Sequence, residues 1–182
     1  MIPVKVDKIS YHSKSKSYAI ILKEIEGDKC MPVIIGSFEA QSIALAIEEI
    51  ETPRPLTHDL ICDFITALDV SLKAIKIYSI NEGVYFAKII IVSERMGEKI
   101  IDARPSDAIA VALRMHTPML VSKKVFEKAS VEEKLLFQEK KRKKINEDPL
   151  PRLKKEMELA VEKEEYELAA ELRDKINKLE VQ

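Results

Sequence analysis

The 182-residue chain contains only two cysteines, Cys30 and Cys62, and neither belongs to a CxxC or Cys/His pattern. The sequence therefore offers no disulfide framework and no zinc-binding motif, and we expect two reduced, buried thiols. No apolar run reaches the ~18 residues of a membrane-spanning helix. The N-terminus, MIPVKVDK, lacks the basic start and apolar core of a secretory signal. These absences predict a soluble, cytoplasmic protein.

An excess of charge of one sign is absent too, because the formal net charge is −1 although 34% of the residues are charged. Any contact with nucleic acid must therefore come from local patches. The motifs HExxH, GxSxG and GxGxxG and the phosphate-binding P-loop are all missing, which leaves hydrolases and nucleotide enzymes of those types without support. With 46% hydrophobic residues, a chain of this length can bury one sizeable core, so we expect one main domain.

The hydrophobic pattern of the first two thirds of the chain predicts an α+β fold. Runs rich in Val and Ile are grouped in hairpins rather than alternating regularly with helices, which predicts a mixed, largely antiparallel sheet packed with helices. Asn81-Glu82-Gly83 is a good hairpin turn, and Ser37 and Thr57 are candidate helix N-caps. The expected strands are 2–11, 18–26, 30–35, 72–80, 85–92, 99–102 and 118–121, and the expected helices are 38–50, 57–68 and 106–115.

The composition changes near Ala129, where strand-like runs stop and charge rises. Ser130 to Glu133 resembles a capping box that opens a further helix. That helix would contain KKRKK at 140–144, which is either a contact for phosphate backbones or a solvated helix face. Beyond it, apolar residues spaced three and four apart predict an α-helical hairpin. The predicted parts are a domain over 1–129, a charged helical linker over 130–149 and the hairpin over 150–182.

Two segments of the expected domain share one pattern: RPLTHD at 54–59 and DARPSD at 102–107. Each has Arg-Pro, then a hydroxyl residue, then an acid in the first turn of a helix. One interpretation is purely structural, since acids stabilise helix N-termini and arginines pair with nearby carboxylates. The other is a site for phosphodiester chemistry. Carboxylates bind Mg²⁺ or Mn²⁺, arginine neutralises phosphate and histidine transfers a proton near neutral pH.

The run PVIIGSFEAQSIALAIEEIETPRPLTHDL, followed by DARPSDAIAVALR, resembles the bifunctional nuclease family. The resemblance covers roughly residues 1–129. It implies a compact α+β domain, often dimeric, and a nuclease that acts on both DNA and RNA with a divalent metal. The positions that match the two motifs are Glu39, Arg54, His58, Asp59, Asp102, Arg104, Ser106 and Asp107.

The chemistry of these side chains suggests a role for each of them. Glu39 can also be ordinary first-turn helix charge, and His58 can be a capping or core histidine. The predicted ligands of Mg²⁺ or Mn²⁺ are Asp59, Asp102, Asp107 and, as a fourth, Glu39. The predicted catalytic residues are Arg54 and Arg104, which would hold the phosphate, His58, which would act as general base or acid, and Ser106.

The C-terminal run LKKEMELAVEKEEYELAAELRDKINKLE is similar to the UVR motif, the helical hairpin shared by the UvrB and UvrC repair proteins. A hairpin this short buries too little surface to be very stable alone, which favours self-association or docking on a protein partner. The predicted contact residues are Tyr166, Ala169, Ala170, Arg173 and Asp174. Two functions therefore stay open: a metal-dependent nuclease that binds DNA and RNA and forms a homodimer, or a non-catalytic adaptor protein linked to DNA repair or stress response.

Overall fold

The structure is a computed structural model that describes residues 1–12, 17–132, 153, 157–158, 160 and 166–180. The chain divides into two compact units, Met1–Glu133 and Lys134–Gln182, and each is described by itself. No helix among the described residues is long and apolar enough to cross a membrane.

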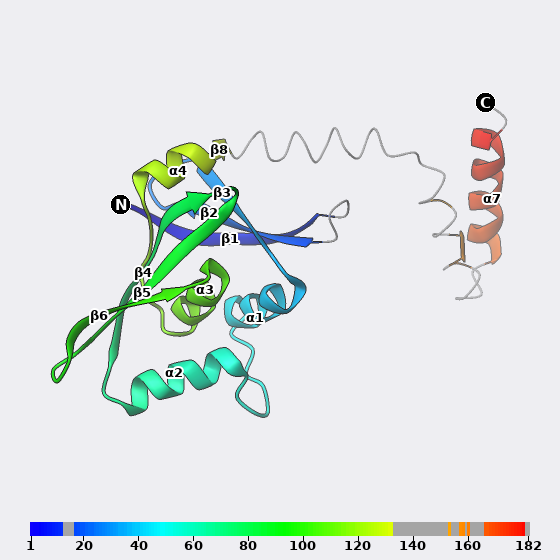
Figure 1. Ribbon diagram of the computed structural model, residues 1–182. Coiled ribbons are helices and arrows are strands. Elements are labelled where there is room, and N and C mark those ends of the chain that lie inside the picture. The colour runs from blue at the N-terminus through cyan, green and yellow to red at the C-terminus, as the bar shows by residue number, and fades with distance from the viewer. Residues whose placement is uncertain (13–16, 133–152, 154–156, 159, 161–165, 181–182) are drawn as a thin grey trace. The chain divides into compact units, whose positions relative to one another are not determined.

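The first unit is built on one sheet of eight strands (Figure 1), in the order β6-β5-β4-β7-β1-β2-β3-β8. Only β4 and β7 pair in parallel, and every other neighbouring pair is antiparallel. The predicted α+β fold with a mixed, largely antiparallel sheet is therefore confirmed. The strands are β1 (Ile2–His12), β2 (Ser17–Glu24), β3 (Lys29–Ile35), β4 (Ser71–Asn81), β5 (Val84–Ser93), β6 (Gly97–Ala103), β7 (Met119–Val121) and β8 (Val131–Glu132).

The β4–β5 hairpin closes at the turn that the sequence predicts. Glu82 and Gly83 both have positive φ, 48° and 81°. Two successive left-handed residues are the mark of a two-residue turn whose twist matches that of the paired strands. The Asn81↔Val84 pair directly before and after this turn sets the register of the long hairpin.

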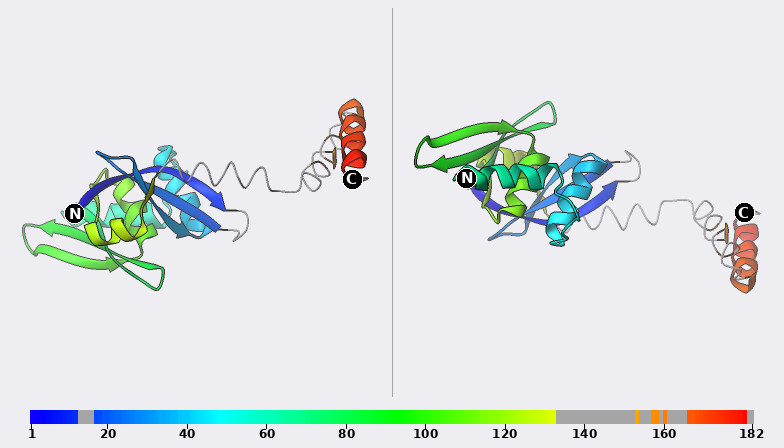
Figure 2. Two further views of the ribbon diagram at one scale, coloured as in Figure 1. Left: turned by 90° about the horizontal axis from the view of Figure 1, so that it is seen from above. Right: turned by 90° about the horizontal axis from the view of Figure 1, so that it is seen from below.

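Four helices accompany the sheet: α1 (Ser37–Ile47), α2 (Thr57–Ala67), α3 (Pro105–Arg114) and α4 (Lys123–Ala129). Figure 2 shows α4 on one side of this unit, in the view from above, and α1 and α2 on the other, in the view from below. The N-caps are Gly36 and Leu56, one residue before the predicted Ser37 and Thr57, and neither supplies a side-chain cap. At α2 the carboxylate of Asp59 accepts the Leu56 N–H instead, at 2.7 Å.

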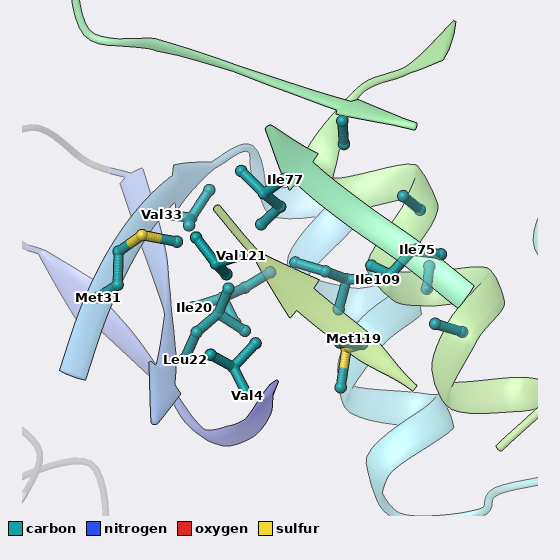
Figure 3. Packing of buried hydrophobic residues seen from close by; sticks show 14 of the residues in the cluster. Val4, Ile20, Leu22, Met31, Val33, Ile75, Ile77, Ile109, Met119 and Val121 are labelled. Carbon is teal, nitrogen blue, oxygen red and sulfur yellow. The ribbon is translucent and has the colours of Figure 1, made fainter. Parts of the chain in front are cut away.

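The core of the first unit lies between the sheet and α3. Ile109 of α3 packs with Ile75 and Ile77 of β4 and with Val121 of β7 (Figure 3). Seven of the ten residues of α3 are buried, whereas α2 buries none. Because α3 is fixed on several sides, the residues at its N-terminus are held firmly in place.

Two features at the end of this unit differ from the sequence prediction. The helix expected to open at Ser130 does not begin there, because Val131–Glu132 form β8 and Val131 pairs with Cys30 at the edge of the sheet. Val131 is β-branched and pairs with a strand that is distant in the sequence, and the local capping pattern contains no information about that pairing. Helix α4 was not predicted at all; Ser122 caps it by accepting the Val125 N–H. The expected linker beyond residue 132 lies outside the described residues.

In the second unit, α7 (Tyr166–Glu180) carries the expected apolar seam. Ala169 and Leu172 of α7 form a buried cluster with Ala160, and Leu153 and Met157 pack against it. All three of these N-terminal residues are helical. The cluster is the contact that a helical hairpin requires.

Candidate active site

A pocket of about 790 Å³ opens between α1, α2, α3 and the strands β5 and β6. Most of its wall is apolar, from side chains such as Ile61, Ile89 and Val111. Polar residues also line it, and they come from α1, α2, α3 and the residue just before α3. They are Glu39, Gln41, Ser42, Thr57, His58, Arg104 and Asp107, and Asp102 of β6 borders the pocket as well.

His58 is hydrogen-bonded at both ring nitrogens. Its Nδ1 lies 2.9 Å from the Ser42 hydroxyl oxygen, and its Nε2 lies 3.3 Å from Asp107 Oδ1. An ionised carboxylate only accepts hydrogen bonds. Nε2 therefore carries a hydrogen atom, and this N–H donates a hydrogen bond to Asp107. In the neutral ring Nδ1 is then unprotonated and accepts the hydrogen bond from the Ser42 hydroxyl. Two residues far apart in the sequence thus fix the tautomer and the orientation of this imidazole.

Arg104 holds the other side of Asp107. Its Nε and Nη2 donate to the two carboxylate oxygens of Asp107 at 2.7 and 2.9 Å, and its Nη1 donates to Glu39 Oε1 at 3.0 Å. Burial raises the pKa of Asp107, but the hydrogen bonds from Arg104 and His58 outweigh it and hold this pKa below its ordinary value. The hydrogen bond to Asp107 is also the main cause that raises the pKa of Arg104. The carboxylate is therefore ionised and the guanidinium charged near neutral pH.

Asp59 lies apart from this group and lines a different pocket, of about 520 Å³, together with Arg114. Arg114 Nε donates to Asp59 Oδ1 at 2.6 Å, and its Nη1 donates to the Ala110 carbonyl at 3.0 Å. The hydrogen bond from Arg114 is the main cause that lowers the pKa of Asp59; burial opposes it and the Leu56 N–H adds to it. Asp59 thus ties the first turn of α2 to the last turn of α3.

The other predicted site residues are Asp102, at the border of the pocket, and Ser106 and Arg54, which do not line it. Asp102 pairs in register with Lys88, so its side chain shares the face of Lys88 and not that of the pocket residue Ile89. Ser106 is buried and lines a smaller cavity beside the pocket, of about 320 Å³. Arg54 is exposed in the loop before α2, where its carbonyl accepts the Thr52 hydroxyl at 2.6 Å.

The structure does not gather the four predicted metal ligands into one group. In the part of the chain that the structure describes, no three His, Cys, Asp or Glu side chains are grouped so that they could hold one ion. Glu39 and Asp107 share the pocket, but both are bound to Arg104. The residues present therefore do not fit a preformed metal site, and the roles of Glu39, Asp59, Asp102 and Asp107 as ligands stay predictions.

Sequence reasoning missed two residues of this region, Ser42 and Arg114. Ser42 is 8% exposed and adjoins the fully buried Ile43, so a polar residue beside the apolar stripe of an amphipathic helix was the available signal. Arg114 is a basic residue in the last turn of α3, where the helix dipole already explains it. Its partner Asp59 is 55 positions away, and no local pattern links them.

An α+β domain whose helix N-termini present acid, imidazole and guanidinium to one pocket agrees with the family that the motifs suggest. The family model of the bifunctional nuclease domain matches residues 20–134. The chain belongs to the bifunctional nuclease domain family. A second model, the UvrB/UvrC motif, matches residues 147–182, which include α7.

Relatives of known sequence share this domain. An uncharacterized protein of Mycobacterium tuberculosis is 40% identical over 128 residues, which are 70% of this chain and 76% of that protein. Bifunctional nuclease 2 of Arabidopsis thaliana is 26% identical over 186 residues, and the match covers 89% of this chain and 55% of the plant protein. Bifunctional nuclease 1 of Oryza sativa subsp. japonica is 24% identical over 111 residues, which are 59% of this chain and 34% of that protein.

Proposed function

We propose that this protein is a nuclease that hydrolyses phosphodiester bonds of DNA and RNA at the pocket lined by His58 and Arg104. The observation that carries the proposal is the continuous chain of hydrogen bonds from Ser42 through His58 and Asp107 to Arg104. It puts a proton-transfer group and a permanent cation side by side at the mouth of one pocket. The family and the names of its plant members support the same reaction class.

Arg104 is the residue that would bind the phosphate. Its side chain is 66% exposed, although three of its five N–H groups are bound to Glu39 and Asp107. The remaining two N–H groups have no partner among the described residues. Guanidinium groups fixed by carboxylates present their free donors in a rigid fork, which suits the oxygens of a phosphate.

His58 is the residue that would accept a proton from the attacking water. Because both ring nitrogens are hydrogen-bonded, the proton would reach Nδ1 through the Ser42 hydroxyl, which would give its own proton to the ring and take one from the water. The Ser42 hydroxyl donates to Nδ1 when the ring is neutral, and the same hydroxyl can rotate so that its oxygen accepts from a protonated Nδ1. The ring therefore keeps its hydrogen bonds in both protonation states. Asp107 accepts the hydrogen bond from Nε2 in both states and keeps the orientation of the ring, the part that a carboxylate plays beside a catalytic imidazole.

Dependence on Mg²⁺ or Mn²⁺ is a further part of the proposal. Among the described residues, the four candidate carboxylates do not form one site. Mg²⁺ commonly binds to proteins through one or two carboxylates together with substrate phosphates and water. Cleavage should therefore be measured with Mg²⁺, with Mn²⁺ and with EDTA.

We also propose that the second unit docks on a protein partner. The UVR match supports this proposal, and so does the exposure of Ala170, Arg173 and Asp174 on α7. Ala169 is buried with Ala160 and Leu172. It would therefore support docking by holding the helices together rather than by touching the partner. Tyr166 opens α7, but its side chain is outside the described residues.

Two further parts of the proposal are a homodimer and a cytoplasmic location. The exposed apolar side chains of α2, among them Phe64 at 59%, give a second copy a surface to cover. Neither Cys30 nor Cys62 forms a disulfide, which agrees with a reducing compartment. A non-catalytic adaptor, the alternative function, would use the same hairpin without any chemistry at the pocket.

The proposal is tested with the purified full chain on single-stranded DNA and on RNA. Arg104→Ala should lower the rate of cleavage of both substrates by about 100-fold, while Arg104→Lys should retain more activity because it keeps the charge without the fork. Arg95→Ala is the matched control, since Arg95 is also exposed but does not line the pocket. If the wild type cleaves neither substrate with either metal, the adaptor alternative replaces the nuclease.

A further inference from the structure

The β4–β5 hairpin carries a cluster of aromatic and basic side chains that the proposed site does not use. The rings of Tyr78 and Phe86 have centroids 6.5 Å apart, and each residue is 37% exposed. The Nζ of Lys88 lies 4.1 Å from the centre of the Tyr78 ring. Lys76 is directly opposite Lys88 in the ladder and therefore on the same face. These four residues are called the outer-face cluster.

The outer-face cluster lies on the face of the sheet that points away from the pocket. Phe86 and Lys88 alternate along β5 with Ala87 and Ile89, and Ile89 lines the pocket. Tyr78 is the extra residue of a bulge, since the register shifts between Ile77 and Ser79. Tyr78 is two residues from Lys76 and therefore lies on the same face as Lys76, where its ring is beside Phe86 and close to the Lys88 ammonium group.

The composition of the cluster indicates what it would bind. Two neighbouring aromatic faces on adjacent strands offer stacking surfaces for unpaired bases, and lysines beside them neutralise phosphates. Lysine is depleted in the cores of protein–protein interfaces, which makes a protein occupant the weaker match. Asp102, opposite Lys88, and Glu98, which pairs with Lys73, add negative charge to the same face. The patch is therefore only moderately basic, and stacking carries more of the recognition.

We propose that the outer-face cluster binds single-stranded DNA or RNA, with bases stacked on Tyr78 and Phe86 and phosphates near Lys76 and Lys88. The choice of ligand rests on the proposed nuclease function, but the surface is separate from the pocket. A strand held there is anchored away from the bond that is cleaved. The cluster therefore raises the affinity for oligonucleotides and has no effect on a substrate that consists of one phosphodiester.

The experiment measures binding by fluorescence anisotropy, with labelled oligo(dT) and oligo(U) of roughly 12 nucleotides and the full-length protein. Tyr78→Leu and Phe86→Leu keep apolar bulk but remove the aromatic face, and each should weaken binding roughly tenfold. Lys88→Ala should reduce the slope of log affinity against log salt concentration by about one phosphate contact. Tyr11→Leu is the matched control, because Tyr11 is 54% exposed and its ring is 5.0 Å from that of Tyr18 on the β1–β2 hairpin.

A second assay separates this proposal from the proposed nuclease. Cleavage of bis(para-nitrophenyl) phosphate, which is too small to reach both surfaces, should be equal in wild type, Tyr78→Leu and Phe86→Leu. Binding that drops in these two variants but not in Tyr11→Leu supports the cluster, even if the wild type cleaves nothing. Absence of oligonucleotide binding by the wild type at low salt, or equal affinity in all three aromatic variants, overturns the cluster and leaves the pocket untouched.

Discussion

At the scale of single residues, His58 is the group around which the candidate site is organised. Its two hydrogen bonds reach Ser42, 16 positions earlier, and Asp107, 49 positions later. Either bond alone would leave the ring free to turn about its side-chain torsion, whereas the two together define one orientation. Arg104 donates two hydrogen bonds to Asp107 and so fixes the carboxylate that orients the imidazole.

The Asp59–Arg114 pair makes the stability of the first unit depend on pH. The pKa of Asp59 is lower in the folded chain than in the unfolded chain, mainly because of the hydrogen bond from Arg114. As the pH falls below ~4, the unfolded chain therefore takes up its proton first. The contribution of the pair to the free energy of unfolding is complete above that pH and is lost as the pH falls further.

We expect Asp59→Asn to lower the free energy of unfolding at pH 7 more than at pH 3, measured by urea unfolding at both values. Asp107 has a lowered pKa as well, so part of the acid dependence should survive in this variant. Asp63→Asn, an exposed position on the same helix, is the control and should shift both values little. A difference between wild type and Asp59→Asn that is the same at both pH values would contradict the assigned role of the pair.

At the scale of the elements, α2 and α4 contrast in how they are held. α4 is a helix of only seven residues, but Phe126 is 2% exposed and lies in the main core. α2 is longer and buries no residue, and Leu56, Leu60, Phe64 and Leu68 form an exposed apolar stripe at intervals of four. A short helix is thus stabilised by packing, while the face of a longer one is left without cover in the single chain.

Matched truncations of phenylalanine test this contrast. Phe126→Ala should lower the free energy of unfolding by about 3 to 5 kcal/mol, because it removes a whole ring from the core. Phe64→Ala should lower it by less than about 1 kcal/mol in the monomer. Chemical unfolding of both variants at low protein concentration provides the comparison. An equally large loss for Phe64→Ala would show that α2 is covered in solution.

The elements also show what sequence patterns can and cannot predict. The β4–β5 hairpin was predicted because its turn chemistry and its alternation are local, and both agree with the structure. β8 and α4 were missed because Val131 and Phe126 gain their partners from distant strands. Some of the residues that line the pocket were predicted from the sequence, because the two Arg-Pro motifs contain His58, Arg104 and Asp107. Their pairing, and the part of Ser42, depend on tertiary packing that no spacing encodes.

At the scale of the whole molecule, the chain joins two units of different character. Residues 1–133 form a unit with a large apolar core, and residues 134–182 form one whose described core consists of small and medium side chains on helices. The nuclease proposal belongs to the first unit and the docking proposal to the second. Either proposal can therefore be wrong while the other holds. Whether the protein is an enzyme depends only on the activity of the pocket.

The most direct measurement is the rate at which the full chain cleaves single-stranded DNA and RNA, compared between wild type and His58→Ala under the same metal conditions. General acid–base catalysis by one residue contributes about 100- to 10,000-fold, so His58→Ala should be slower by at least about 100-fold. Thermal melting of both proteins controls for folding, because His58 is only partly buried and its loss should leave a cooperative transition. Equal cleavage rates in the two proteins, or no cleavage by the wild type, would contradict the assignment of this pocket as a nuclease site.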